Sequence, residues 1–87
     1  MNRGMPHRIR LSQEAINALE KLDPPTARRI LEKINESAGD PHHFFVRLTN
    51  SELYKLRVGD WRVIALISPA VQEIFVVTIG HRKNVYE

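Results

Sequence analysis

The spacing of apolar residues changes about halfway along the chain, from a helical to an alternating pattern. In the first half, residues 15–22 and 27–38 each carry apolar side chains at helical spacing. The members of these two stripes are Ala15, Ile16, Leu19 and Leu22, then Ala27, Ile30, Leu31, Ile34 and Ala38. Each stripe predicts an amphipathic helix that buries one face.

Residues that cap or terminate helices mark the ends of both stripes. Ser12 stands at an N-cap position just before the first stripe. The segment Asp23-Pro24-Pro25 ends the first helix and begins the second, because Asp caps a helix and Pro fits its first position. Gly39 and Pro41 are expected to end the second helix. A corner this short predicts that the two helices pack as a hairpin.

Short apolar and β-branched segments predict strands on either side of the helices. Residues 6–11 alternate apolar and charged side chains. After the second helix, residues 44–48, 53–58, 61–67 and 73–79 predict four strands, with turns at 59–60 and 68–70. One strand, a helical hairpin and then an antiparallel β-meander predict an α+β fold. We expect the helices on one face of a single sheet and the other face open.

The Gly59-Asp60 pair predicts the register of the central hairpin. A two-residue loop with Gly first suits a type II′ turn, which pairs Val58 with Trp61. The side chains that then face the helices are those of Tyr54, Leu56, Val58, Trp61, Val63 and Ala65. The side chains expected on the open face are those of Leu53, Lys55, Arg57, Arg62, Ile64 and Leu66.

This register gathers positive charge on the open face. Arg57 stands directly opposite Arg62, with Lys55 two residues away, and no acidic residue of these two strands shares that face. Like charges directly opposite each other destabilise a sheet. Solvated side chains are one interpretation, but three converging cations favour an anion site. Arginine contacts phosphate oxygens bidentately, which favours a phosphodiester as the anion.

The C-terminal segment adds groups that suit proton transfer and charge stabilisation. His81, Arg82, Lys83 and Tyr86 follow the last predicted strand. Taken alone, this segment also fits an ordinary solvated tail. A meander would place the last strand beside the 61–67 strand, so we expect the tail to lie near Arg62.

The length and composition indicate a single small domain and exclude several kinds of site. Eighty-seven residues make one domain, which we expect to span residues 1–87. The absence of cysteine excludes disulfides and cysteine-ligated metals. The adjacent His42 and His43 have no third ligand nearby in sequence, so we expect a loop there and no metal site. No apolar run reaches the roughly 18–20 residues of a membrane span, and the first residues lack a signal peptide's apolar stretch, so we expect a cytoplasmic protein.

Two segments together resemble the RelE/ParE superfamily of toxins, and its RelE branch in particular. They are residues 53–64, LYKLRVGDWRVI, and residues 79–86, IGHRKNVY. The predicted strand, helical hairpin and meander also fit the RelE-like fold in order and length. Trp61 stands where the family usually has tyrosine.

The resemblance implies the toxin of a type II toxin–antitoxin system. Toxins of the RelE branch enter the ribosomal A site and cut messenger RNA there, which inhibits translation. A ribose 2′-hydroxyl attacks the adjacent phosphate without a metal or other cofactor. The implied partners are a RelB-like antitoxin, in a toxin–antitoxin heterotetramer, together with the ribosome and its mRNA.

The resemblance also implies site residues by position. The implied catalytic residues are Arg62, Arg82, Tyr86, Lys55, Arg57 and His81, and the implied RNA-binding residues are Lys55, Arg57 and Lys83. Arg62 matches the arginine that stabilises the phosphate, and Arg82 matches the arginine near the leaving group. Tyr86 matches the tyrosine that orients or activates the nucleophile.

Two of these roles remain open at this point. Arg57 stays charged in proteins, so it fits RNA binding better than proton transfer. His81 fits an acid or base, because histidine exchanges protons near neutral pH, but a supporting or solvated role is equally compatible. Two rival functions also remain, namely a ParE-like toxin that poisons DNA gyrase and an inactive member that acts only as a binding partner.

Overall fold

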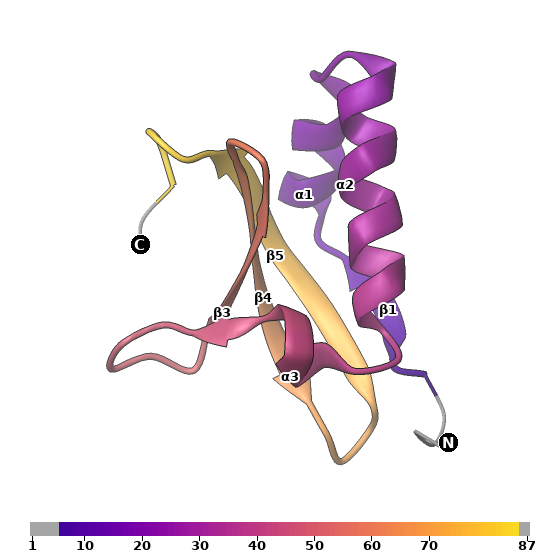
Figure 1. Ribbon diagram of the computed structural model, residues 1–87, viewed down its shortest axis with the longest axis vertical. Coiled ribbons are helices and arrows are strands. Elements are labelled where there is room, and N and C mark those ends of the chain that lie inside the picture. Colours follow the sequence, from indigo (N-terminus) through magenta and orange to yellow (C-terminus); the bar gives the residue numbers. More distant parts are fainter. Residues whose placement is uncertain (1–5, 86–87) are drawn as a thin grey trace.

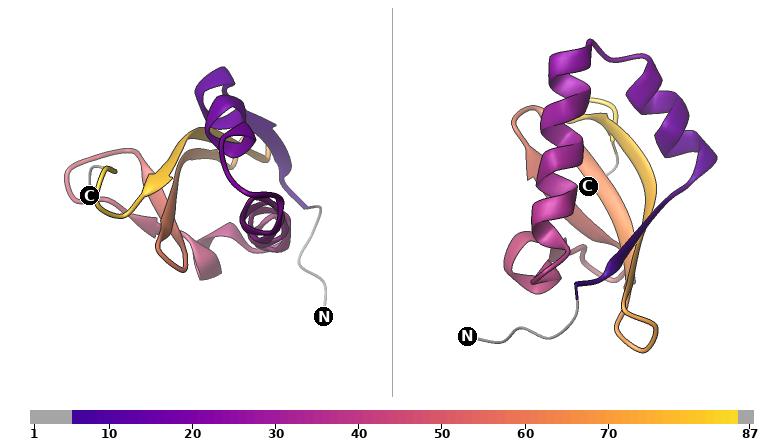
Figure 2. Two further views of the ribbon diagram at one scale, coloured as in Figure 1. Left: turned by 90° about the horizontal axis from the view of Figure 1, so that it is seen from above. Right: turned by 90° about the vertical axis from the view of Figure 1, so that its right-hand side faces the viewer.

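The computed structural model describes residues 6–85 and contains one five-stranded sheet with its helices. The elements in chain order are β1 (Arg8–Leu11), α1 (Gln13–Glu20), α2 (Pro24–Ser37), α3 (Pro41–Phe44), β2 (Val46–Arg47), β3 (Tyr54–Val58), β4 (Trp61–Ser68) and β5 (Glu73–His81). The strand order in the sheet is β1-β5-β4-β3-β2. Strand β1 runs parallel to β5, and the other neighbours are antiparallel. Helices α1 and α2 lie on one face of the sheet (Figures 1 and 2), so the predicted α+β fold is confirmed.

The core lies between the two long helices and the sheet. Helix α2 contributes Ile30 and Ile34, which are fully buried, and α1 contributes Ala15. The buried sheet residues of the same cluster are Leu56, Val58, Val63, Ala65, Ile74, Val76 and Ile79. Tyr54 and Trp61 pack against this cluster and are partly buried. The side chains predicted to face the helices therefore do so.

Both predicted N-caps are confirmed. The Ser12 hydroxyl accepts a hydrogen bond from the Ala15 N–H at 3.0 Å and donates to the Val77 carbonyl at 2.6 Å. Asp23 accepts from the Thr26 N–H at 3.1 Å, and Pro24 begins α2. Hydrogen bonds from the side chain and backbone of Thr26 lower the pKa of Asp23, because they stabilise its carboxylate form. Ser12 thus connects α1 to strand β5, whereas the Asp23 cap is local.

Replacing Ser12 by alanine should lower the free energy of unfolding by about 1–2 kcal/mol, because the N-cap and the contact to β5 are lost together. Gln13→Ala is the control, since the exposed Gln13 side chain donates a hydrogen bond to its helix neighbour Asn17. Urea denaturation of both variants measures the difference. An equal loss in the two variants would contradict the role given to Ser12.

The predicted strand over residues 44–48 is wrong at its start. Residues 41–44 form the short helix α3, because Pro41 occupies its first turn and the Phe45 N–H donates to the Pro41 carbonyl at 2.8 Å. The strand that follows is only Val46–Arg47. His42 and His43 therefore lie on a helix and not in the expected loop.

The second face of the sheet is only partly open. Arg62 and Ile64 were expected there, yet each retains only 4% of its accessible surface. Val85 reaches this face, because its Cγ2 lies against Gly80, the partner of Arg62 on β5. The expectation of an open face is thus wrong around these two residues. Within residues 6–85, no helix has the length and apolar character needed to cross a membrane.

Candidate functional site

The turn between β3 and β4 has the predicted geometry. Gly59 has a φ of 60°, and Asp60 is not among the residues with positive φ, as a type II′ turn requires. Val58 pairs with Trp61 and Arg57 pairs with Arg62, so the predicted register is confirmed. A Cβ at Gly59 would lie 2.6 Å from Nη2 of Arg29 on α2, but that atom ends a flexible side chain that can move, so the positive φ is what favours glycine here.

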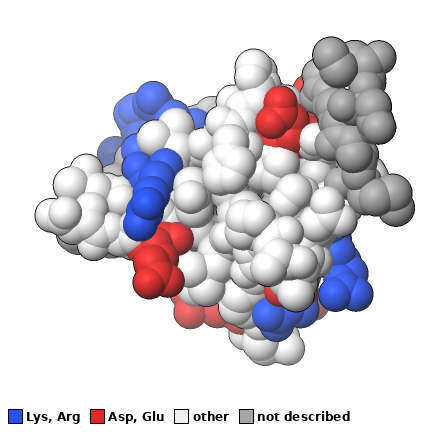
Figure 3. All heavy atoms as spheres, turned by 90° about the horizontal axis from the view of Figure 1, so that it is seen from below, with Lys and Arg blue, Asp and Glu red and all other residues white. Residues whose placement is uncertain are grey.

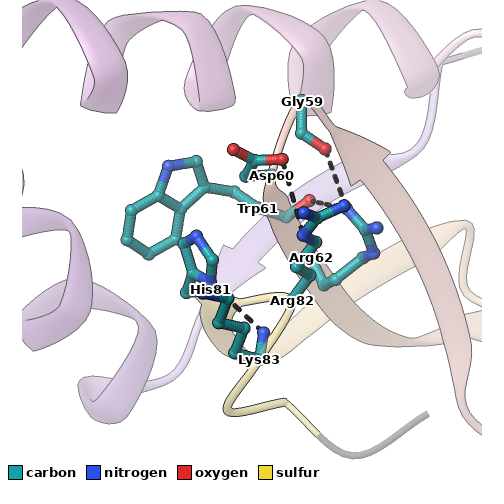
Figure 4. Close-up of polar contacts among 7 residues, drawn as sticks. All are labelled: Gly59, Asp60, Trp61, Arg62, His81, Arg82 and Lys83. Carbon is teal, nitrogen blue, oxygen red and sulfur yellow. Dashed lines mark hydrogen bonds and ion pairs between the residues drawn. The ribbon is translucent and has the colours of Figure 1, made fainter.

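The Arg62 side chain is hydrogen-bonded to the backbone of this turn. Its Nη1 donates to the carbonyls of Gly59 and Trp61, both at 2.9 Å (Figure 4). The guanidinium is therefore tied to the backbone of its own hairpin and is not a solvated arm. A charge fixed in a buried position interacts more strongly with its surroundings than a charge in water.

Arg82 reaches the same turn from the end of β5. Its backbone N–H donates to the Asp60 carbonyl at 2.8 Å. Its Nε lies 3.7 Å from Oδ1 of Asp60, and both side chains are more than half exposed. Asp60 therefore joins the start of the C-terminal segment to the hairpin turn, a role that the sequence pattern did not show.

The remaining predicted cations line the adjoining surface. Arg57 is exposed opposite Arg62, whereas Lys55 is half-buried opposite Ile64. Lys83 is exposed just beyond Arg82. The structure thus brings Arg57, Arg62 and Arg82 together at one turn, with Lys55 further along β3. Tyr86, the remaining candidate, lies outside the described residues.

His81 lies on the other side of the sheet from Arg62. It pairs with Trp61 across β4 and β5, and the two rings meet edge to face with centroids 5.4 Å apart (Figure 4). Its Nδ1 accepts a hydrogen bond from the Lys83 N–H at 3.2 Å. This arrangement fits a residue that holds the C-terminal segment in place better than one whose side chain reaches Arg62.

One acidic residue near the tail was missed by the sequence analysis. Glu14 accepts a hydrogen bond from the Thr78 hydroxyl at 2.6 Å. It lines a pocket of about 280 Å³ on the Ile64 side of the sheet. The pocket is otherwise lined by Leu48, Leu53, Ile64, Val77, Thr78, Asn84 and Val85. No local signal places Glu14 there, because α1 meets β5 only through the tertiary fold.

Two further surfaces have mixed charge. A pocket of about 320 Å³ between α2 and the hairpin reaches the turn itself, because Gly59 and Arg57 line it. Helix α2 adds two cations, Arg29 and Lys33, and two carboxylates, Glu32 and Glu36, to its lining. At the opposite end of the molecule, Figure 3 shows basic and acidic groups scattered around a mainly uncharged centre. Among residues 6–85, no cluster of three or more His, Asp or Glu side chains could hold a metal ion. The cations Arg57, Arg62 and Arg82 make the Gly59 turn the candidate anion site.

Comparison with known proteins finds matches over most of the chain. The sequence model for the ParE toxin of the type II toxin–antitoxin system parDE matches residues 9–86. A search of curated proteins gave no match.

Three solved toxin–antitoxin complexes contain a chain of similar fold. The RelBE2 complex from Mycobacterium tuberculosis matches with a TM-score of 0.79 at 20% identity, over 90% of this chain and 100% of that one. The archaeal RelE–RelB complex from Pyrococcus horikoshii matches with a TM-score of 0.77 at 25% identity, over 93% and 100%. The intact RelBE complex from E. coli matches with a TM-score of 0.74 at 16% identity, over 86% and 95%.

Proposed function

The chain belongs to the ParE toxin family within the RelE/ParE superfamily of type II toxin–antitoxin systems, and we propose that it is a ribosome-dependent endoribonuclease that cuts mRNA in the A site. The observation that carries this proposal is the position of Arg57, Arg62 and Arg82 beside one hairpin turn. Three carboxylates lie near the turn, those of Asp60, Glu32 and Glu36, and they are outnumbered by the five cations Arg29, Lys33, Arg57, Arg62 and Arg82. A site of this composition suits a phosphodiester whose negative charge increases during the reaction.

The proposed chemistry needs proton transfer and charge stabilisation. The ribose 2′-oxygen forms a bond to phosphorus as the bond from phosphorus to the 5′-oxygen breaks. The 2′-hydroxyl loses its proton, the 5′-oxygen gains one, and a cyclic phosphate remains. Arg57 and Lys55 would hold the RNA, Arg62 would stabilise the developing charge from its fixed position, and Arg82 would act near the leaving oxygen.

The proton-transfer groups remain a proposal from the resemblance. Tyr86 is the candidate for orienting or activating the 2′-hydroxyl. His81 is a weaker candidate in this structure, because its ring packs on Trp61 and its Nδ1 is engaged by Lys83. An arginine-rich site has no strong base, so we expect free RNA to be cut poorly unless the ribosome orients the substrate.

An antitoxin is the proposed protein partner, as in the RelE–RelB complexes of similar fold. The surface proposed for it is the pocket on the Ile64 side of the sheet, whose lining is mainly apolar and includes one acidic residue, Glu14. A segment bound there would lie beside the tail and cover the route to Arg62. This assembly would explain how the toxin is kept inactive.

The family match itself favours a second function, namely the poisoning of DNA gyrase by a ParE-like toxin. Primer extension on mRNA from ribosomes incubated with the protein, in parallel with a gyrase supercoiling assay, distinguishes the two. Discrete cuts in A-site codons, abolished by the antitoxin, would support the ribonuclease. Gyrase inhibition without cuts would support the ParE-like function, and neither effect would indicate an inactive binding partner.

Ribosome binding should weaken steeply with salt if the cations meet phosphates. Four phosphate contacts by Lys55, Arg57, Arg82 and Lys83 predict a log–log slope of about −3 on the single-strand coefficient. Binding titrations between low and moderate salt measure this slope. The double variant Arg28→Ala/Lys21→Ala is the control, because it removes two exposed cations outside the proposed site and should leave the slope unchanged. A slope near zero in the native protein would contradict the proposal that these cations contact phosphates.

A further inference from the structure

Gly80 occupies a position where the C-terminal segment crosses the sheet. It pairs with Arg62 on β4, one residue before β5 ends. A Cβ built on Gly80 would overlap Cγ2 of Val85, so a side chain and this contact cannot coexist. The tail therefore packs directly on the backbone of the strand next to Arg62.

The tail reaches Gly80 through a tight turn at His81. The N–H groups of Asn84 and Val85 both donate to the His81 carbonyl, at 2.8 and 3.0 Å. The Lys83 N–H donates to the His81 ring, and the Arg82 N–H is held by Asp60. These bonds return the chain to the Arg62 side of the sheet, where Val85 forms part of the wall of the Ile64 pocket.

Gly80 is required because the Val85 side chain occupies the space of a Cβ, and not because of its backbone φ. Among the described glycines, only Gly59 has a positive φ. The Gly80 backbone is therefore open to any L-residue, and the Val85 side chain is what excludes a larger one. Gly39 provides the contrast, because a Cβ there would meet no atom within 4 Å.

We propose that Gly80 is a positioning residue whose missing side chain lets Val85 dock and so fixes the Arg82–Val85 segment beside Arg62. Gly80 sits in a paired strand, whereas the tail is held by a few bonds at an exposed end. An added methyl group should therefore displace the tail and leave the sheet in place. The consequence for cleavage rests on the proposed ribonuclease function, but the consequence for tail position does not.

The experiment compares Gly80→Ala, Val85→Ala and the double variant, with Gly39→Ala as the matched control. NMR detects the contact between the Val85 methyl groups and residue 80, and 15N relaxation reports the order of residues 83–85. In Gly80→Ala, the contact between Val85 and residue 80 should be lost, and residues 83–85 should become as mobile as an unattached chain end. Single-turnover cleavage should fall about 10- to 100-fold, because small misplacements of catalytic groups are costly. Gly39→Ala should behave as the native protein.

The double variant provides the decisive comparison. Val85→Ala removes the methyl group that a side chain at position 80 would meet, so Gly80→Ala/Val85→Ala should restore tail order and most of the cleavage rate. An ordered tail in Gly80→Ala would overturn the inference, and so would a double variant as mobile as the single one. If the native protein cuts no mRNA, the proposed function fails, and the relaxation data still decide the role of Gly80.

Discussion

Replacing Arg62 by alanine should lower the rate of single-turnover mRNA cleavage by about 100- to 1000-fold, the usual loss for one rigid donor that stabilises transition-state charge. Arg62 is held by two backbone carbonyls, so its charge is already in place when the phosphate charge develops. Such a fixed charge affects turnover more than binding. The measurement is cleavage of A-site mRNA at saturating ribosome concentration.

The same substitution should also cost stability. Removal of the guanidinium leaves the Gly59 and Trp61 carbonyls without this donor, at about 1–3 kcal/mol. Rates must therefore be compared below the melting transition, with folding confirmed by circular dichroism. Arg62→Lys should recover only part of the rate, because an ammonium group cannot reproduce the planar contact. Arg28→Ala, on the exposed side of α2, is the control for loss of a positive charge.

A folded Arg62→Ala variant that cuts at the native rate would remove Arg62 from the catalytic set. The gyrase-poisoning or inactive interpretations would then be favoured. A variant that loses both ribosome binding and turnover to the same extent would instead indicate a binding role for this residue.

Replacing Arg82 by alanine should reduce cleavage on the order of 100-fold with little change in stability. The side chain is exposed, and an exposed ion pair contributes little to folding. Its backbone bond to Asp60 does not depend on the side chain, so the tail should stay attached to the turn.

The Asp60→Asn variant distinguishes a catalytic role of Arg82 from a structural role in its ion pair with Asp60. This substitution removes the carboxylate that pairs with Arg82 but keeps the guanidinium and the backbone contact. Cleavage should therefore stay near the native rate, and ribosome binding should strengthen at low salt. If Arg82→Ala and Asp60→Asn lose activity equally, the ion pair itself matters, and Arg82 has no separate role at the leaving group.

Local rules were sufficient for much of the fold. The Ser12 and Asp23 caps depend on residues three positions away, so a short stretch of sequence contains all the information they need. The Gly59-Asp60 turn likewise predicts its own register, and that register placed Arg57 opposite Arg62. The short helix α3 is the local exception, because the apolar 44–48 segment fits either a strand or the end of a helix.

The amino-acid sequence by itself determined the α+β class, the helix caps, the hairpin register and the set of cations, because each follows from contacts within a few residues or from strand alternation. Only the tertiary structure decided how deeply these side chains are buried and which distant residues they contact. Arg62 is buried, His81 lies with Trp61, and Glu14 meets Thr78. Val85 returns over Gly80. These outcomes depend on how β4 and α1 meet β5 and on where the tail turns. They arise from contacts between residues far apart in the chain or from close packing, which spacing patterns do not encode.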